Sequence, residues 1–381
     1  MKSALNPKMR SFLDEQVNRH VITRDQLATP IPKDIFIESA ELGLFSASLS
    51  KNIGGGGLDP LSYGLLLEDL GKHSTDFSFV MLSSLFPAVA NTIQETATPW
   101  MIERYLRPAV HGKCLASFAY TEGADPFSFR SSCEKKGDKY IINGEKFYVM
   151  GGMQADLFMV YVRDEKNDLL TFLIERDDDG LEIIPLTTMS GLRSVGLAGL
   201  KFNNIVLDAN RILTPADGLS HVQRFLNLRR ISVICGLVGK MQSIYDDLMN
   251  NLIGTTRYER PLTVMQNVQS LLGKMYVSIE TSRAMLYRAL EKLRDKNIEP
   301  LWDPFLTATK YHIVDQANQF MLQVFRLAGG KGYIQDQQYG RFQRDFTGLI
   351  PTVGAQDTIE VDLGVWATHN FEQRQHRKKA P

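Results

Sequence analysis

The chain has 381 residues, of which 44% are hydrophobic, enough to bury one large core or two to three packed units. Its 43 basic and 43 acidic residues balance, so no net charge draws it toward nucleic acid or anionic lipid. The stretch MKSALNPKMRSFLDEQVNRH lacks the apolar run of a signal peptide or membrane span, so we expect a cytoplasmic protein. Three separated cysteines without CxxC spacing indicate neither a disulfide framework nor a metal site.

The first part of the chain has a helical pattern. Apolar residues recur three or four positions apart in IPKDIFIESAELGLFSASL and PLSYGLLLEDLGKHS, and the turn segment KNIGGGGLDP separates them. PWMIERYLRPAVHGK predicts a further helix that ends near Gly112. We therefore predict an N-terminal helical domain over residues 1–113.

From Cys114 the apolar period changes to two, as β-strands require, in CLASFAYTE, KYIINGEKFYVMGG, DLFMVYVRD, LLTFLIERDD, LEIIPL and LAGLKFNNIVL. The Asn143–Gly144 pair predicts a type I′ hairpin turn between KYII and EKFYV. These segments predict a middle antiparallel β-barrel or sandwich domain over residues 114–214.

The helical period returns over residues 215–381. HVQRFLNLRRISVICGLVGKMQSIYDDLMNNL, TVMQNVQSLLGKMYVSIETSRAMLYRALEKLRD and PFLTATKYHIVDQANQFMLQVFRLAGG are each long enough for a member of a four-helix bundle, and a final helix begins near Asp357. The order of helices, strands and helices predicts an α+β fold with a C-terminal four-helix bundle. No GxGxxG or P-loop pattern supports a nucleotide site of those kinds.

Six motifs resemble those of one family in chain order. GGGGLDPLSYGLLLEDLGK resembles a glycine-rich turn before an EEL helix, SFAYTEG a strand ending in Thr-Glu-Pro-Gly, and INGEKFYVMGG the pattern ING.K.WITNG. MSGLRSVGLAGLKFNNIVL, RYERPLTVMQ and RLAGGKGYIQDQQYGRFQRD resemble K.G.R.S....V.F..V.VP, R.QFG.P....Q and Q..GG.GY......R..RD. Together with the domain order, these motifs resemble the acyl-CoA dehydrogenase family across nearly the whole chain.

The resemblance implies FAD as cofactor. A flavin ring needs a flat apolar slot with hydrogen-bond donors, and the strand ends supply Tyr120, Thr121 and Tyr148 as its walls. The family's threonine that bonds flavin N5 aligns with Met150, and the arginine of R.QFG is displaced by one residue to Arg257. Further cofactor-binding residues on this resemblance are Arg326, which replaces a glutamine, Gly329, Gly330 and Asp357.

In this family the arginine reaches the FAD of a neighbouring subunit. The resemblance therefore implies a homodimer, or a homotetramer built from two dimers. The long apolar faces of the bundle helices are consistent with such a partner.

The chain departs from the family at its catalytic base. Counting from Arg344–Asp345, the family's glutamate falls on Val353, and the alternative base position on the first bundle helix falls on Arg229. Neither side chain can accept the substrate proton. Substitute candidates are Asp357 and Glu122, with Asp125 and Asp345 behind them; each has a structural explanation, such as a helix N-cap for Asp357 and ordering of the flavin loop for Glu122.

Arg229 and Arg230 fall where the acyl pocket is expected. Two buried cations need anionic partners, so they predict an acidic or polar acyl group. Adjacent helical residues point about 100° apart, so we expect Arg230 to face inward and Arg229 to lie at the mouth.

Three functions follow as alternatives. The first is an FAD-dependent oxidoreductase that acts on a short polar acyl thioester of CoA or an acyl-carrier protein in a biosynthetic pathway, with electron-transfer flavoprotein or oxygen as acceptor. The second is a flavin-dependent monooxygenase of the same fold, which tolerates loss of the glutamate. The third is a catalytically inactive binding protein.

Overall fold

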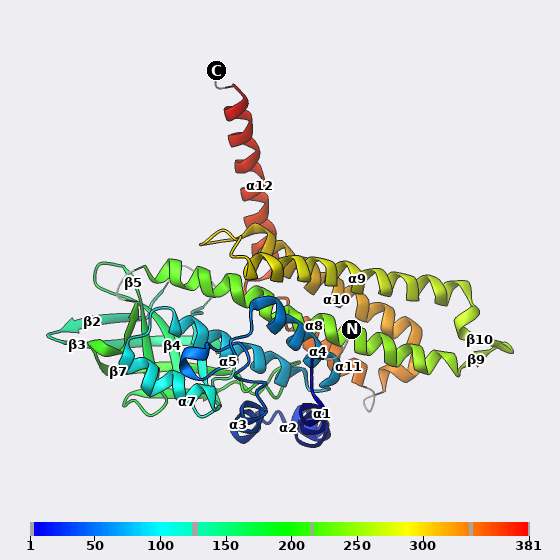
Figure 1. Cartoon of the computed structure of the whole chain (residues 1–381), viewed down its shortest axis with the longest axis horizontal. Coiled ribbons are helices and arrows are strands. Elements are labelled where there is room, and N and C mark those ends of the chain that lie inside the picture. Colours follow the sequence, from blue (N-terminus) through cyan, green and yellow to red (C-terminus); the bar gives the residue numbers. More distant parts are fainter. Residues whose placement is uncertain (1–3, 124–128, 215–216, 335–337, 380–381) are drawn as a thin grey trace.

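The structure is a computed structural model that describes residues 4–123, 129–214, 217–334 and 338–379. Helices come first, a sheet follows, and long helices complete the chain (Figure 1). The amino-terminal helices are α1 Pro7–Phe12, α2 Val21–Leu27, α3 Lys33–Glu41, α4 Pro60–His73, α5 Phe77–Gln94, α6 Pro99–Met101 and α7 Arg107–Val110. Short π- and 3-10 segments, Leu13–Val17, Asn18–His20, Lys51–Ile53 and Ile102–Leu106, join them.

Helix α5 is the core helix of this part. Asp76 caps it, because its carboxylate accepts a hydrogen bond from the Phe79 amide at 3.3 Å. Side chains on all of its faces are buried. It is also the one described helix that is long and apolar enough by composition to cross a membrane, but its burial inside the protein identifies it as a core helix.

The glycine run before α4 is a tight turn. A Cβ on Gly55 would lie 2.2 Å from the Leu49 carbonyl oxygen, and one on Gly56 would lie 2.8 Å from that of Ala47. The Gly54 and Gly57 backbones have φ of +100° and +63°, which glycine adopts without a Cβ penalty. The glycines are therefore required by the backbone path that leads into α4.

The middle sheet has strands in the order β6-β7-β3-β2-β4-β5-β8, with β1 added beside β4. The strands are β1 Ala116–Ala119, β2 Ser132–Lys136, β3 Lys139–Val149, β4 Leu157–Arg163, β5 Leu169–Glu175, β6 Leu181–Pro185, β7 Ala198–Asp208 and β8 Ile212–Thr214. The prediction of a wholly antiparallel sheet is wrong at β4, which pairs in parallel with β1 and β2. The β2–β3 hairpin lies between β1 and β4 in the chain and provides the long connection that parallel strands need.

The predicted hairpin at Asn143–Gly144 is also wrong, because β3 continues through both residues. The turn lies instead at Gly137, where φ is +66°. Asn143 faces Asn204 of β7 at a register irregularity, and its side-chain oxygen accepts the Asn204 amide at 2.8 Å. A Cβ on Gly144 would lie 2.4 Å from the Ser131 hydroxyl, so the glycine permits close packing within the sheet.

The carboxy-terminal part contains α8 Gly218–Ile253, α9 Gln266–Arg294, α10 Pro304–Ala328, α11 Gln338–Thr347 and α12 Gln356–Lys379. A small hairpin, β9 Thr256–Arg257 and β10 Arg260–Pro261, joins α8 to α9. Helices α8, α9 and α10 pack side by side, and α4 packs against α8 and α9. The fourth long helix, α12, contacts α10 near its start and then projects away from the body (Figure 1).

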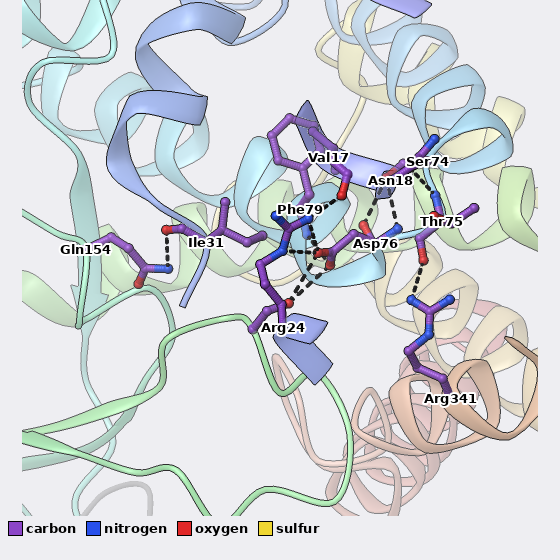
Figure 2. A network of polar contacts seen from close by, with 11 residues as sticks. Val17, Asn18, Arg24, Ile31, Ser74, Thr75, Asp76, Phe79, Gln154 and Arg341 are labelled. Atoms are coloured by element: carbon purple, nitrogen blue, oxygen red, sulfur yellow. Dashed lines mark hydrogen bonds and ion pairs between the residues drawn. The ribbon is translucent and has the colours of Figure 1, made fainter. Parts of the chain in front are cut away.

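A buried polar junction joins the three parts of the chain, and Figure 2 shows its centre. Arg24 of α2 forms an ion pair with Asp76 at 3.0 Å, and the Ser194 hydroxyl donates to the same carboxylate at 3.2 Å. Arg341 of α11 donates to the Thr75 carbonyl at 2.8 Å. Its neighbour Asp345 accepts the Leu192 amide at 2.6 Å, and burial raises the pKa of Asp345 to about 7.

Candidate functional site

The end of strand β1 leads into an aromatic cluster. The Tyr120 ring lies 4.9 Å from that of Phe129, 5.5 Å from that of Tyr161 and 5.8 Å from that of Phe118. Phe118 in turn stacks on Phe225 of α8 at 4.3 Å, which joins the strand to the first bundle helix. A cavity of about 230 Å³ opens beside the cluster, and its walls include Tyr120, Phe129 and the start of α8. Tyr120 therefore lies where the end of β1, the cavity and the start of α8 meet.

Thr121 and Glu122 continue from this strand. The Thr121 carbonyl accepts the Phe147 amide at 2.8 Å, which ties the end of β1 to β3. Glu122 forms a buried ion pair with Lys146, and its second oxygen accepts the Ser131 amide at 3.1 Å. Burial opposes ionisation of Glu122, but Lys146 and these hydrogen bonds outweigh it and hold its pKa below the ordinary value. Burial lowers the pKa of Lys146 to about 8.

These contacts give Glu122 an ordering role. Its oxygens are already engaged by Lys146 and by two backbone amides. The structure thus supports the loop-ordering interpretation of Glu122 over the substitute base. Asp125 lies outside the described residues, and Asp345 is held in the domain junction by the Leu192 amide.

Tyr148 and Met150 stand at the end of β3. Tyr148 is 68% exposed and has a left-handed φ of +56°, so the backbone turns its ring away from the β-domain core. Met150 is half-buried, and its carbonyl accepts a hydrogen bond from the Ser117 hydroxyl. Next to it, a Cβ on Gly151 would lie 2.7 Å from the Phe86 ring of α5. The turn at Met150 is therefore pressed against α5.

Three further predicted cofactor residues lie around the end of α10: Arg326 in its last turn, and Gly329 and Gly330 directly after it. Gly329 and Gly330 line a groove of about 750 Å³, together with residues of α2 and α11. Nothing lies within 4 Å of a Cβ built on either glycine, so a ligand can approach this backbone closely. Arg326 is exposed and donates to the Gln323 side chain at 3.0 Å. Asp357 does not belong to this group: it is exposed in the first turn of α12, which contacts α10 at Tyr311, about 27 Å of helix from Gly329.

One chain does not bring the two groups together. Arg257 lies in the β9–β10 hairpin, at the opposite end of the long helices from the β sheet that carries Tyr148 (Figure 1). Both β9 residues are exposed to solvent. Arg257 and Tyr148 of the same chain therefore do not form one binding site.

The segment between α11 and α12 carries Val353, whose φ is +57°. A β-branched residue rarely adopts this conformation, and such strain is found mostly at functional sites. The following backbone is held by Lys310 of α10, whose ammonium donates to the Gly354 carbonyl at 2.8 Å and to the Gln356 side chain at 3.2 Å. Sequence reasoning missed Lys310, although a lone lysine in the apolar pattern PFLTATKYHIV was a visible signal.

Lys310 is fully buried, and burial together with Arg230 lowers its pKa to about 7. Arg229 and Arg230 are 2% and 5% exposed, and burial lowers the pKa of each to about 10, so both stay charged at neutral pH. The expectation that Arg229 lies at the pocket mouth is wrong, because its guanidinium donates to the Ser84 hydroxyl of the core helix α5 at 2.7 Å. Arg230 points toward Asn227 at 3.4 Å.

The chain thus combines a helical domain, a mixed sheet and a helical bundle in the order helix–sheet–helix. The amino-terminal, middle and C-terminal domains of acyl-CoA dehydrogenases match residues 2–113, 117–205 and 216–358. The chain belongs to the acyl-CoA dehydrogenase family, whose members are FAD-dependent oxidoreductases acting on acyl thioesters.

Individual relatives are distant in sequence. The 3-(aryl)acrylate reductase of Clostridium sporogenes is 24% identical over 344 residues, covering 88% of this chain and 90% of the relative. The prolyl acyl-carrier-protein oxidase AnaB superposes with a TM-score of 0.86 at 23% identity, covering 96% of this chain and 100% of that one. FkbI, which serves biosynthesis of a methoxymalonyl extender unit, has a TM-score of 0.84 at 18% identity, covering 94% and 99%.

Each of the two groups of predicted residues offers a surface that suits one half of FAD, although the two groups lie apart within one chain. The exposed Tyr148 ring and the open glycine backbone at Gly329 and Gly330 provide an aromatic face and a close-approach surface of the kinds that an isoalloxazine ring and a diphosphate require. Tyr120, Thr121 and Met150 would border the ring, while Arg257, Arg326, Gly329, Gly330 and Asp357 remain predicted contacts of the adenosine diphosphate half.

The Glu122–Lys146 pair leads to a prediction about cofactor retention. Glu122→Gln leaves the buried Lys146 ammonium without its counter-ion, which costs about 3–5 kcal/mol when one partner of a buried pair is removed. We expect the purified variant to be less stable and to hold less FAD per chain, as measured by absorbance after heat release. Glu134→Gln, at an exposed pair with Lys136, is the control. Full FAD content in Glu122→Gln would contradict an ordering role.

Proposed function

We propose that the chain oxidises a short polar acyl thioester, carried by CoA or an acyl-carrier protein, in a biosynthetic pathway. The observation that carries this proposal is the burial of Arg229 and Arg230 on α8 with no carboxylate of the described residues at ion-pair distance. A buried charge without a partner costs several kcal/mol, so a polar or anionic substrate group supplies what the fold lacks. A purely aliphatic acyl chain has no polar group to pair with the buried arginines.

The missing glutamate limits the chemistry. FAD supplies the two-electron acceptor, so the substrate must lose a hydride and a proton together. Val353 cannot accept that proton, and general-base assistance is typically worth about 10²–10⁴ in rate. Substrates with an already acidic proton, or with a C–OH or C–NH₂ group as the starting point, are less dependent on this base. Electron-transfer flavoprotein or oxygen is proposed to reoxidise the flavin.

Two proteins of similar structure support an acyl-carrier protein as carrier and a biosynthetic pathway as setting, but they do not determine either for this chain. AnaB is named as an acyl-carrier-protein oxidase, and FkbI as a protein of extender-unit biosynthesis. Both share the fold of this chain, although the identities of 23% and 18% extend no further than the fold. The acyl group itself is therefore argued from the arginines.

The proposal predicts that the purified protein contains FAD and that anaerobic addition of a polar acyl thioester bleaches it. Absorption spectra recorded against a panel of CoA and acyl-carrier thioesters measure this directly. FAD that no thioester reduces, combined with product formation only when reduced flavin and oxygen are supplied, would indicate a monooxygenase instead. A colourless protein that binds no flavin would indicate an inactive scaffold.

Val353→Glu tests the base position. The glutamate would stand next to the segment held by Lys310, where cations favour its ionised form. With a butyryl thioester, whose α-proton is not activated, we expect flavin reduction about 10²–10⁴ times faster than in the wild type. Val353→Gln, which has the same size and no basic group, is the matched control. Equal rates in both variants would show that residue 353 does not face the substrate.

We also propose a homodimer or homotetramer in which α12 contacts a second chain. Val365 and Phe371 of this projecting helix are 66% and 60% exposed, which is unusual for large apolar side chains on a solvated helix. Val365→Glu is expected to lower the mass measured by sedimentation velocity, because it places a charge in an apolar contact. Gln373→Glu on the same helix is the control. A wild-type protein that sediments as a monomer would refute the assembly.

A further inference from the structure

The turn at Met150 is held from one side by strand β1. Ser117 of this strand is fully buried, and its hydroxyl donates a hydrogen bond to the Met150 carbonyl. No other residue in the described part of the chain donates to that carbonyl. One buried side chain therefore sets the direction in which the carbonyl points.

Helix α5 holds the same turn from another side. Gly151 has a left-handed φ of +70°, and a Cβ on it would lie 2.7 Å from the Phe86 ring. The Gly152 amide donates to the Val149 carbonyl at 3.1 Å and closes the turn. Because β1 and α5 both contact the turn, the peptide group that joins Met150 to Gly151 has a fixed orientation.

Two backbone donors of the turn have no partner within the protein. The N–H groups of Met150 and Gly151 have no hydrogen-bond acceptor among the described residues, although Gly151 is buried and Met150 is half-buried. Such donors are nearly always paired in folded proteins, because an unpaired buried N–H costs about as much free energy as a lost hydrogen bond. A ligand that brings an acceptor to this turn would satisfy them.

Ser117 also determines where the Gly151 N–H points. The carbonyl and the N–H of one trans peptide group point in opposite directions. With the Met150 carbonyl bound to Ser117, the Gly151 N–H is directed away from β1. The direction of this donor is therefore set before any ligand binds.

The residues around the turn suit the ring of a flavin. Tyr148 presents an exposed aromatic ring two residues before Met150. The Thr121 carbonyl accepts the Phe147 amide at 2.8 Å, so the ends of β1 and β3, which carry the predicted ring contacts, lie side by side. An oxidised isoalloxazine ring presents N5 and its carbonyl oxygens as acceptors at its edge. The turn thus supplies donors of the kind that this edge accepts.

The side chains beside the turn do not provide this donor. Lys146, a buried lysine of β3, is paired with Glu122 and donates to the Tyr120 carbonyl at 3.2 Å. The threonine hydroxyl that bonds flavin N5 in the family falls on Met150, whose thioether cannot donate a hydrogen bond. A ring bound at this turn therefore needs a backbone donor in place of the hydroxyl.

We propose that the Gly151 N–H donates to N5 of the flavin ring, in place of the hydroxyl that Met150 lacks, and that Ser117 is the positioning residue that directs this N–H. Ser117 does not touch the cofactor but acts through the peptide group that it holds. The proposal concerns the cofactor alone, so it stands or falls independently of the acyl group that the chain oxidises.

The experiment compares FAD with 5-deaza-FAD, which has the same shape but carries a C–H group in place of N5. The full chain is freed of flavin, and each compound is titrated into it while flavin fluorescence is recorded. Leaving a buried donor without an acceptor corresponds to about a 5- to 100-fold loss of affinity. We therefore expect the wild type to bind FAD about 5- to 100-fold more tightly than 5-deaza-FAD.

Ser117→Ala should bring this affinity ratio close to one, because the hydroxyl no longer holds the peptide group. Ser117→Cys keeps the size of the side chain and a weak donor, so it should give an intermediate ratio, and it replaces the alanine variant if that variant does not fold. Ser39→Ala is the matched control. The Ser39 hydroxyl is fully buried and donates to the Phe36 carbonyl of α3 at 2.9 Å, and its loss should leave the ratio unchanged.

A purely structural role of Ser117 gives a different result. Ser117→Ala would then lower the thermal unfolding midpoint and weaken the binding of both flavins equally, with the same affinity ratio as the wild type. An unchanged ratio in this variant, or a wild-type ratio near one, would overturn the proposal. A chain that binds neither compound would overturn it as well.

Hydrogen exchange in the wild type tests the donor without any substitution. In a peptide that spans residues 148–152, FAD should slow the exchange of one backbone amide more than 5-deaza-FAD does, because only FAD offers an acceptor at N5. Equal protection by the two compounds would show that the donor lies elsewhere.

Discussion

The buried Asp76 carboxylate is the contact on which the rest of the arrangement depends. It caps α5, pairs with Arg24 of α2 and accepts the Ser194 hydroxyl from the loop before β7. One carboxylate therefore fixes the start of the core helix to an amino-terminal helix and to the β domain. Asp345 strengthens the junction by binding the Leu192 amide from α11. The free-energy cost of removing these charged groups from water is offset only when all of their partners are present together.

Because its start is fixed in this way, α5 holds two parts of the candidate site in place. Leu82 and Phe86 on one face meet the turn at Gly151, next to Met150. Met81 and Ser84 on another face hold the guanidinium of Arg229. The turn at Met150, which is predicted to border the flavin, and the proposed acyl-binding arginine are thus aligned through a single rigid element. The arginine gains its orientation from the same helix that sets the turn.

Much of the fold could be predicted from sequence because local periodicity and capping agree with tertiary structure. Helix α10 begins at Pro304 behind its Asp303 cap and ends before Gly329, as its residue pattern indicates. The Asn143–Gly144 turn could not be separated from a bulge by local pattern, because the deciding contact is with Asn204, some sixty residues away. The parallel pairing of β1 with β4 is likewise a non-local choice.

The site was predictable only in part. Tyr120, Thr121 and Tyr148 were expected at strand ends and lie there, whereas Met150, Gly329 and Gly330 came from the family resemblance; their contacts with FAD stay predictions. The orientation of Arg229 could not be predicted from sequence. Helical geometry separates the directions of two adjacent arginines, but it does not say on which side of α8 helix α5 lies. Lys310 was overlooked because its role depends on the backbone of a segment more than forty residues later.

That segment has a wider consequence. The left-handed backbone at Val353 is followed by Gly354, whose φ is +96°. The Gly354 carbonyl accepts a hydrogen bond from the buried Lys310 of α10. Gly354 and Lys310 set part of this path without any contribution from the side chain at 353, and the half-buried Val353 side chain adds packing against the main core. A lineage could therefore lose or regain its proton-accepting group at this position through single substitutions, with little rebuilding of the protein around it.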